Sequence, residues 1–267
     1  MKTHRREAAV RAKTPDELRK MRHAGAIVAA ALQETRLIVA PGVTTASLDA
    51  LAETVIRDLG GVPSFKGYMG YPATICASVN EEIVHGIPGP RALREGDIVS
   101  IDVGAIWQGY QGDAAITVAV GAVEPRLLAL MKATEAALWA GIKAARVGVR
   151  LGEVSHAIEM AARAAGFEVI REYGGHGIGR AMHEEPRVTN WGPPDRGMRL
   201  EQGVTLALEP MLSLGGYSTR VLADHWTVVT VDGSPTAHYE HTVAVMPDGA
   251  KVLTRHDGAP GADIREE

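Results

Sequence analysis

Residues 97–120, DIVSIDVGAIWQGYQGDAAITVAV, contain two apolar runs that predict neighbouring strands, Asp97–Val103 and Ala114–Val120. Asp102 lies inside the first run, and Asp113 directly precedes the second. A carboxylate within a buried strand is strongly unfavourable unless it is paired or bound to a metal. Because a hairpin between the two runs would bring both carboxylates to one place, this stretch predicts a β-hairpin that carries a chemical site.

The segments around this hairpin predict helices followed by short strands. The stretch Thr14-Pro15-Asp16-Glu17 is typical of a helix N-terminus with a capping box, and Pro41-Gly42 ends that helix. Further helices are expected at about 47–59, 124–147 and 152–165, a turn at 108–112, and strands at 73–79, 168–172, 204–209, 226–231 and 241–245. Helices and strands are therefore segregated along the chain, which favours an α+β fold with an antiparallel or mixed sheet over alternating βαβ units.

Composition narrows the class of protein. The 267 residues include 28 Lys and Arg against 32 Asp and Glu, and the net charge of −4 argues against nucleic-acid binding by bulk charge. A single cysteine, Cys76, excludes an intrachain disulfide framework and a cysteine-based zinc finger. The longest helix-like apolar stretch, 26–32, is too short to cross a bilayer and no targeting segment is apparent, so we expect a cytoplasmic protein without a membrane anchor.

One catalytic domain is expected over residues 14–253, between two flexible tails. Residues 1–13 are basic and predict a solvated leader, although contact with ribosomal RNA or a different anionic surface stays open. Residues 254–267 are polar and glycine-rich, which is typical of a loose end.

Three further segments place titratable side chains beside apolar runs or tight turns. Glu209 closes a strand-like run, Glu240 directly precedes another, and His176 lies within the glycine-rich stretch GGHGIG. Taken one at a time, each of these residues has an ordinary structural explanation. Together with Asp102 and Asp113 they form an oxygen-rich set with one imidazole, which suits two divalent cations that activate water. These residues leave open whether an amide or a phosphate ester is cleaved.

Several separate motifs, in order, make the chain similar to a known family. The longest is Tyr173–Trp191, around His176, and the shorter ones are Asn80 with His85-Gly86-Ile87-Pro88, Gly96-Asp97-Ile98-Val99, His183-Glu184-Glu185-Pro186, Glu209-Pro210-Met211 and Tyr239-Glu240-His241-Thr242. From Lys13 to about Leu253 the chain resembles the type I methionine aminopeptidases. The resemblance implies their pita-bread (creatinase/aminopeptidase-like) fold, a pseudo-two-fold α+β arrangement with helices covering the outer face of the sheet.

The resemblance also implies a dinuclear metal site. Its five protein ligands would be Asp102, Asp113, His176, Glu209 and Glu240, with Asp113 and Glu240 bridging two divalent ions of Co, Mn, Fe(II) or Zn. A hydroxide between the ions would attack the first peptide bond, and Glu209 would shuttle the proton. The implied activity is methionyl aminopeptidase, a hydrolase that removes the initiator methionine from nascent proteins and prefers a small second residue.

Substrate contacts follow from the same resemblance. His183 would hydrogen-bond the substrate carbonyl or the tetrahedral oxygen, and His85 would contact the amide of the second residue. The methionine pocket would be formed by aromatic and sulfur-containing side chains, namely Phe65, Tyr68, Tyr71, Cys76, Met182 and Trp226.

The chain departs from the family pattern at positions near these residues. Phe65 stands where the family often has Cys, and Met182 stands where Phe is common. Ala114 and Ala115 follow Asp113 where a hydroxyl residue is frequent, so a hydrogen bond to a metal carboxylate is expected to be missing. These departures leave open whether the protein is the housekeeping enzyme or a paralogue with an altered substrate preference.

The expected partners are nascent polypeptide N-termini, with transient ribosome contact. No membrane and no specific nucleic acid are expected, and the protein is expected to be a monomer.

Two related groups of peptidases differ from this chain in their organisation. Prolidases carry a large N-terminal domain, whereas 101 residues precede Asp102 here. Type II methionine enzymes insert a subdomain between two glutamates that are only 31 positions apart in this chain, Glu209 and Glu240.

Two functions outside these peptidases stay open on the residues alone. One is a phosphoesterase, although no Lys or Arg cluster adjoins the ligands in sequence. The second is a non-catalytic protein that holds a peptide in the same cleft, although all five ligands are present. A cleavage assay on short peptides separates both from an aminopeptidase.

Overall fold

The computed structural model describes residues 10–255, which form four α helices and a short 3₁₀ helix. They are α1 (Pro15–Ile38), α2 (Thr45–Asp58), η1 (Tyr68–Gly70), α3 (Pro125–Ala144) and α4 (Leu151–Ala164). The last three helices expected from the sequence are confirmed, with ends that differ by one to three residues. Within the described range, no helix has both the length and the apolar character needed to cross a membrane.

Four sheets, in which every recorded strand pair is antiparallel, make up the rest of the fold over these residues. The first joins β1 (Val62–Pro63), β2 (Ile75–Val79), β4 (Ile98–Trp107) and β5 (Tyr110–Ala119). The second has the order β15 (Gly249–Val252), β14 (His241–Met246), β9 (Thr205–Leu208), β7 (Gly175–Gly177) and β8 (Glu184–Val188). Two three-stranded sheets complete the set, β13 (Thr236–His238) with β10 (Met211–Ser213) and β6 (Glu168–Val169), and β11 (Thr219–Val221) with β12 (Val228–Thr230) and β3 (Glu82–Val84).

The predicted hairpin is present as β4 and β5, but its strands are longer than the sequence pattern indicates. The strands run to Trp107 and Tyr110, so the turn is Gln108-Gly109 rather than 108–112. Both turn residues have positive φ, 47° and 76°, which matches the twist of a tight hairpin. Gly112 lies inside β5 because the strand passes close to α1, where an added Cβ would lie 2.7 Å from the backbone nitrogen of Gly25.

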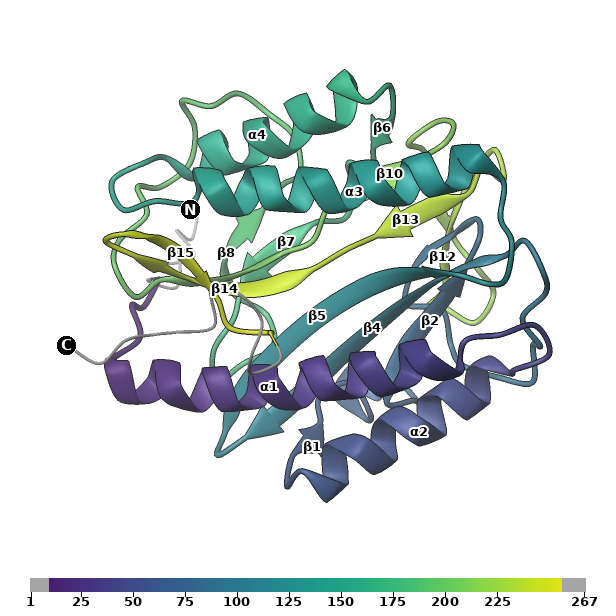
Figure 1. Cartoon of the computed structure of the whole chain (residues 1–267). Helices are drawn as coiled ribbons and strands as arrows, with labels where there is room; N and C mark the ends of the chain where they lie inside the picture. The colour runs from purple at the N-terminus through teal and green to yellow at the C-terminus, as the bar shows by residue number, and fades with distance from the viewer. Residues whose placement is uncertain (1–9, 256–267) are drawn as a thin grey trace, which may run out of the picture.

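The two pairs of helices cover opposite sides of the strands (Figure 1). One apolar core lies between α1, α2 and the β4 sheet, and includes Val28, Leu48, Ile56, Ile75 and Ile101. The other lies between α3, α4 and the β14 sheet, and includes Leu130, Leu138, Ile158, Leu206 and Val243. Each helix pair packs on its own sheet, which gives the expected pseudo-two-fold α+β architecture. The strands form the middle layer between the two helix pairs (Figure 1).

The ends of the domain make specific contacts. The predicted capping box is present: Glu17 N–H donates to Thr14 Oγ1 at 3.3 Å, and Thr14 N–H donates to Glu17 Oε2 at 2.8 Å. Lys13, assigned to the tail from the sequence, donates its backbone N–H to Gly203 O at 2.7 Å and its Nζ lies 2.8 Å from Glu184 Oε2. At the C-terminal end Thr254 is buried. The expected flexibility of 1–9 and 256–267 falls outside the described residues.

Candidate active site

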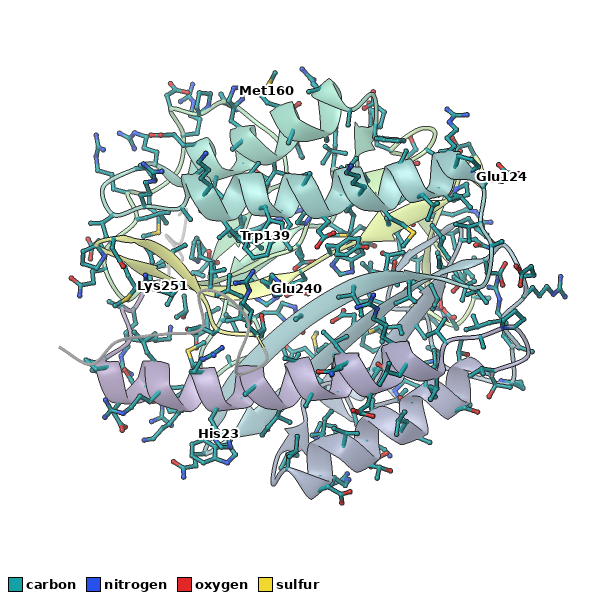
Figure 2. All side chains as sticks on the ribbon, viewed as in Figure 1. His23, Glu124, Trp139, Met160, Glu240 and Lys251 are labelled. Carbon is teal, nitrogen blue, oxygen red and sulfur yellow. The ribbon has the colours of Figure 1, made fainter. Side chains whose placement is uncertain are left out.

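The topology brings the five predicted ligands to the centre of the molecule. Asp102 lies on β4 and Asp113 on β5, His176 lies on β7, and Glu209 and Glu240 flank the pair of β9 with β14. Leu208 pairs with His241, so Glu209 directly after one strand and Glu240 directly before the other emerge at the same end of that pair. Figure 2 shows Glu240 between the layer of α1 and the layer of α3.

Backbone hydrogen bonds fix the two halves of the site to each other. Glu240 N–H donates to Ala115 O at 2.9 Å, which attaches the Glu240 segment to β5. Thr242 Oγ1 accepts from Asp113 N–H at 3.0 Å and donates to Asp113 O at 2.8 Å. The carboxylates of Asp113 and Glu240 are therefore placed by contacts that join the first half of the chain to the second.

Two overlapping groups of metal-ligating atoms result. Asp113, His176 and Glu240 form one, and Glu209, His238 and Glu240 form the other, with the ligand atoms of each group within 4.8 Å of one another. Glu240 belongs to both groups, and His176 Nε2 lies 3.6 Å from Glu209 Oε1. Asp102 belongs to neither group, but its carboxyl lies close enough to those of Asp113, Glu209 and Glu240 to raise their pKa values. The structure thus gathers all five predicted residues and adds His238.

The donor atoms of this cluster fit divalent cations. Five buried side-chain atoms of residues 10–255 have no hydrogen-bond partner: four belong to this cluster, Asp102 Oδ1, Asp113 Oδ1, Glu240 Oε1 and His238 Nε2, and the fifth is Asn190 Oδ1. Buried polar atoms without partners are costly, and a cation in the cluster would satisfy these four together. Carboxylate oxygens with imidazole nitrogens suit Mn, Fe, Co or Zn.

Burial and crowding make the acids hold protons when no cation neutralises them. Burial raises the pKa of Asp102 to about 7 and that of Glu209 to about 8, and the Asp102 carboxylate adds to the effect on Glu209. The pKa values of Asp113 and Glu240 are also raised well above the ordinary range by burial and by neighbouring acids. Like charges at this separation cannot all ionise in a dry site without a counter-ion.

The tautomer of His176 leaves one defined nitrogen, Nε2, as a metal donor. Burial lowers its pKa to about 4, so the ring is neutral near pH 7. Its Nδ1 lies 2.9 Å from the backbone carbonyl of Gly177, which can only accept, so Nδ1 carries the hydrogen. Nε2 then carries the lone pair, and it lies 3.6 Å from Glu209 Oε1.

The metal-free protein should lose stability as the pH rises from about 7 to about 8.5. In this range the unfolded chain has ionised carboxyls and mostly neutral histidines, whereas the folded chain still binds protons on Asp102 and Glu209 and their neighbours. The folded state then binds more protons than the unfolded state, so the free energy of unfolding decreases with pH. Urea denaturation of chelator-treated protein at both pH values measures this. Saturation with Mn²⁺ should remove the decrease, and a metal-free protein that is more stable at the higher pH would contradict the prediction.

His183 and His85 lie beside the cluster. The His183 ring centroid is 4.3 Å from that of His176, and Tyr68 Oη lies 2.8 Å from His183 Nδ1. His85 has φ 61°, and its ring makes edge contacts with Tyr173 and Trp226 at centroid distances of 6.1 and 6.2 Å. Neither imidazole belongs to either group of ligating atoms: His183 adjoins His176, and His85 interacts electrostatically with His183 and His238.

The six predicted pocket residues form part of one apolar cluster. Phe65, Tyr71, Cys76 and Met182 are buried in it, and Tyr68 and Trp226 pack against it. Cys76 is paired with Asp102 across β2 and β4, so this cluster adjoins the acids directly. Burial raises the pKa of the Cys76 thiol, which agrees with a structural rather than a nucleophilic cysteine.

His238 is the residue that the sequence interpretation missed. It lies two positions before Glu240, and side chains two apart along an extended chain point to the same side. This spacing was the available signal, but His238 has no glycine neighbours to set it apart from an ordinary buried histidine.

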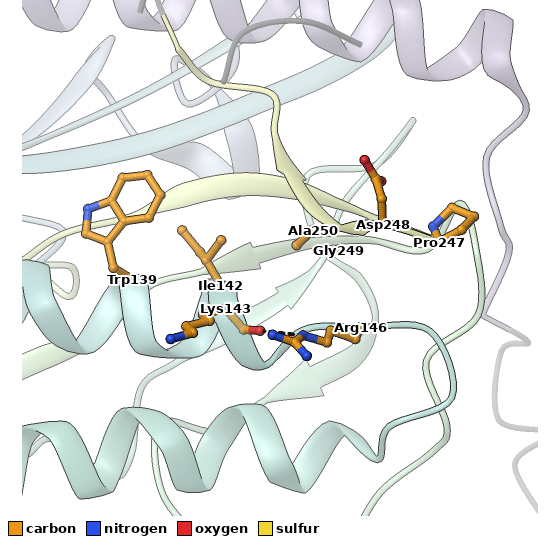
Figure 3. Close-up of a pocket in the computed structure, with 8 residues that line it drawn as sticks. All are labelled: Trp139, Ile142, Lys143, Arg146, Pro247, Asp248, Gly249 and Ala250. Atoms are coloured by element: carbon orange, nitrogen blue, oxygen red, sulfur yellow. Dashed lines mark hydrogen bonds between the residues drawn. The ribbon is translucent and has the colours of Figure 1, made fainter. Parts of the chain in front are cut away.

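A separate hollow of about 480 Å³ lies on the surface between α3 and the turn joining β14 to β15 (Figure 3). It is lined by Trp139, Ile142, Lys143, Arg146, Pro247, Asp248, Gly249 and Ala250. None of the predicted site residues is among them, so this hollow is distinct from the acidic cluster.

An antiparallel α+β fold with a helix pair on each side of the strands, and with buried carboxylates and imidazoles at its centre, suits a metal-dependent hydrolase. The family model of metallopeptidase family M24 matches residues 19–247. The chain therefore belongs to metallopeptidase family M24, and within it to the type I methionine aminopeptidases.

Three relatives that bear the name methionine aminopeptidase support this assignment. Methionine aminopeptidase 1 of Bacillus subtilis is 49% identical over 243 residues, covering 91% of this chain and 98% of the relative. Methionine aminopeptidase 1 of Mycobacterium tuberculosis is 54% identical over 245 residues, covering 89% and 92%. The methionine aminopeptidase of Thermotoga maritima superposes with a TM-score of 0.92 at 47% identity, covering 93% and 100%.

The fold extends to more distant peptidases. A prolidase from Pyrococcus furiosus superposes with a TM-score of 0.76 at 21% identity, and the match covers 92% of this chain but 66% of the prolidase. At this identity the likeness concerns the fold alone. The prediction of a pita-bread fold is confirmed.

Proposed function

We infer that this chain is a methionyl aminopeptidase that removes the initiator methionine from nascent proteins in a metal-dependent reaction. The observation that carries this inference is the junction of two features: a buried set of carboxylates and imidazoles, and an apolar cluster rich in aromatic and sulfur atoms that touches it at the pairing of Cys76 with Asp102. Relatives with 49% and 54% identity over almost the whole domain bear the name methionine aminopeptidase.

We propose that Asp102, Asp113, His176, Glu209 and Glu240 hold two divalent ions, Co, Mn, Fe(II) or Zn. When bound, such ions lower the pKa of water and polarise a carbonyl, which is the chemistry that amide hydrolysis needs. The overlap of the two ligating groups at Glu240 supports a shared carboxylate between two ions. Glu209 faces both imidazoles of the cluster, and we assign it the transfer of a proton from the attacking water to the departing amino group.

The two histidines outside the ligand groups would hold the substrate. With Tyr68 Oη donating to Nδ1 of His183, the Nε2–H of that ring is free to donate to the carbonyl oxygen of the first residue. His85 would contact the amide of the second residue. Burial lowers the pKa of His85 to about 4, so near neutral pH it acts as a neutral hydrogen-bonding group.

The methionine side chain would occupy the pocket formed by Phe65, Tyr68, Tyr71, Cys76, Met182 and Trp226. Edge-to-face packing of Tyr71 on Trp226, with centroids 5.0 Å apart, gives one rigid aromatic wall. A Cβ added at Gly104 would meet Phe65 at 2.6 Å and Met182 at 3.0 Å. Phe65 and Met182 therefore border the same small volume, which supports the idea that a larger residue at one position compensates for a smaller one at the other.

The proposed substrate indicates where in the cell the enzyme works. New polypeptide N-termini are available in the cytoplasm, where we place the enzyme, with transient contact to the ribosome. We also propose that it works as a monomer, since the cluster is built entirely from one chain.

Peptides that differ at the first two positions should distinguish this activity from its neighbours. Metal-loaded protein should release methionine from Met-Ala-Ser, leave Met-Lys-Ser largely intact because its second side chain is long, and leave Ala-Pro-Ser intact because the apolar pocket is not filled. Mass spectrometry of the three reactions gives the result directly. Cleavage of Ala-Pro-Ser in preference to Met-Ala-Ser would move the protein to the proline-specific branch of the fold.

A further inference from the structure

His238 occupies a rigid and almost fully enclosed position at the end of β13. Its side chain is 2% exposed. Thr117 Oγ1 holds its backbone from both directions, accepting from His238 N–H at 2.9 Å and donating to His238 O at 2.9 Å. The residue is paired with Met211 across β10, two positions beyond Glu209. The direction of the imidazole is therefore set by the sheet and not by a flexible loop.

The Nε2 atom of this ring points into the carboxylate cluster without a hydrogen-bond partner. It lies 3.8 Å from Glu209 Oε2 and 3.9 Å from Glu240 Oε2. These separations exceed a hydrogen bond, for which about 2.7–3.2 Å is usual. They suit atoms that share one cation, because ligand distances of about 2.0–2.2 Å place neighbouring ligands about 3–4 Å apart.

A buried imidazole nitrogen that faces two carboxyl groups without a hydrogen bond is costly. A cation bound by the three side chains together would remove that cost.

We propose that His238 is a sixth protein ligand of the metal centre, binding through Nε2 the ion that Glu209 and Glu240 also hold. This rests on the metal centre of the proposed function and goes beyond its five ligands. The centre then has two imidazoles, His176 and His238. An additional nitrogen donor favours Zn, Co or Fe(II) over Mn at that position, since Mn prefers oxygen ligands.

A crystal structure of the protein soaked with Zn²⁺, with anomalous data at the zinc edge, tests the proposal. The expected result is a zinc ion about 2.0–2.2 Å from His238 Nε2. Zinc bound by the neighbouring carboxylates with His238 Nε2 more than about 3 Å from it, well beyond a zinc–nitrogen bond, would overturn this inference and leave the proposed function intact. A crystal with no metal among these acids would overturn both.

Metal affinity gives a second readout that does not depend on activity. Chelator competition should show that His238→Gln weakens Zn²⁺ binding by more than about tenfold, with a smaller effect on Mn²⁺. His241→Gln is the matched control, because that neighbouring histidine bonds Thr254 Oγ1 at 2.9 Å and packs on Trp139 away from the acids. Equal Zn²⁺ affinity in His238→Gln and the unsubstituted protein would contradict the proposal, and thermal melting of both metal-free variants checks that they fold.

Discussion

Replacing Glu240 with Ala should lower the rate of methionine release from Met-Ala-Ser by more than about 100-fold, which is beyond the usual cost of removing a hydrogen-bond partner of a metal ligand. The reason is that Glu240 belongs to both groups of ligating atoms, so one substitution removes a donor from each. It also removes the carboxylate that lies beside Asp113 in one of these groups. Turnover and metal content by elemental mass spectrometry should fall together.

An exposed glutamate provides the control for this change. Glu201 lies on the surface between β8 and β9, away from the cluster, and Glu201→Ala should keep both turnover and metal content. A Glu240→Ala protein with full turnover and two bound ions would refute its assignment as a shared ligand. Loss of turnover in Glu201→Ala would show instead that the assay responds to any loss of surface charge.

Replacing His183 with Ala should leave the metal content unchanged and reduce kcat by about 10²–10³-fold, as expected for one donor to a developing oxyanion. His183 lies outside both groups of ligating atoms, yet its ring is 4.3 Å from that of His176. Its effect should therefore appear in the chemical step more than in binding. Steady-state kinetics with Met-Ala-Ser, together with metal analysis, separates the two.

The half-buried His156 on α4 is the matched control for this second change, and His156→Ala should retain kcat. If His183→Ala instead loses its metal, His183 is a ligand and not a substrate-binding residue. If kcat is unchanged while the metal stays bound, a different group stabilises the oxyanion.

Much of the fold was predictable because strong local signals agree with the tertiary structure. The capping box at Thr14 and Glu17 and the three later helices follow from sequence patterns that tertiary packing does not override. The length of β5 was not predictable, because Gly112 reads as a turn residue until the close approach of α1 is known. Short strands such as β6 and β11 depend on partners distant in sequence, which local patterns do not specify.

The candidate site was likewise predictable only in part from the sequence. Asp102 and Glu209 stand out in the sequence because an acid inside or at the end of an apolar run needs an explanation. Their convergence with His176 depends on pairings between strands far apart in the sequence, which the family resemblance supplied and local patterns did not. The only sequence signal for His238 is its position two residues before Glu240, and the direction of its Nε2 toward Glu209 and Glu240 becomes visible only in the structure.

The most direct test of the central claim is a metal titration of activity. Protein stripped by a chelator is reloaded with increasing equivalents of Mn²⁺, Co²⁺, Fe²⁺ or Zn²⁺, and free methionine from Met-Ala-Ser is measured by mass spectrometry at each step. We predict no release from the stripped protein and release that appears as the buried carboxylates fill. Full release without metal, or none when the protein has bound two equivalents of every metal tried, would contradict the account.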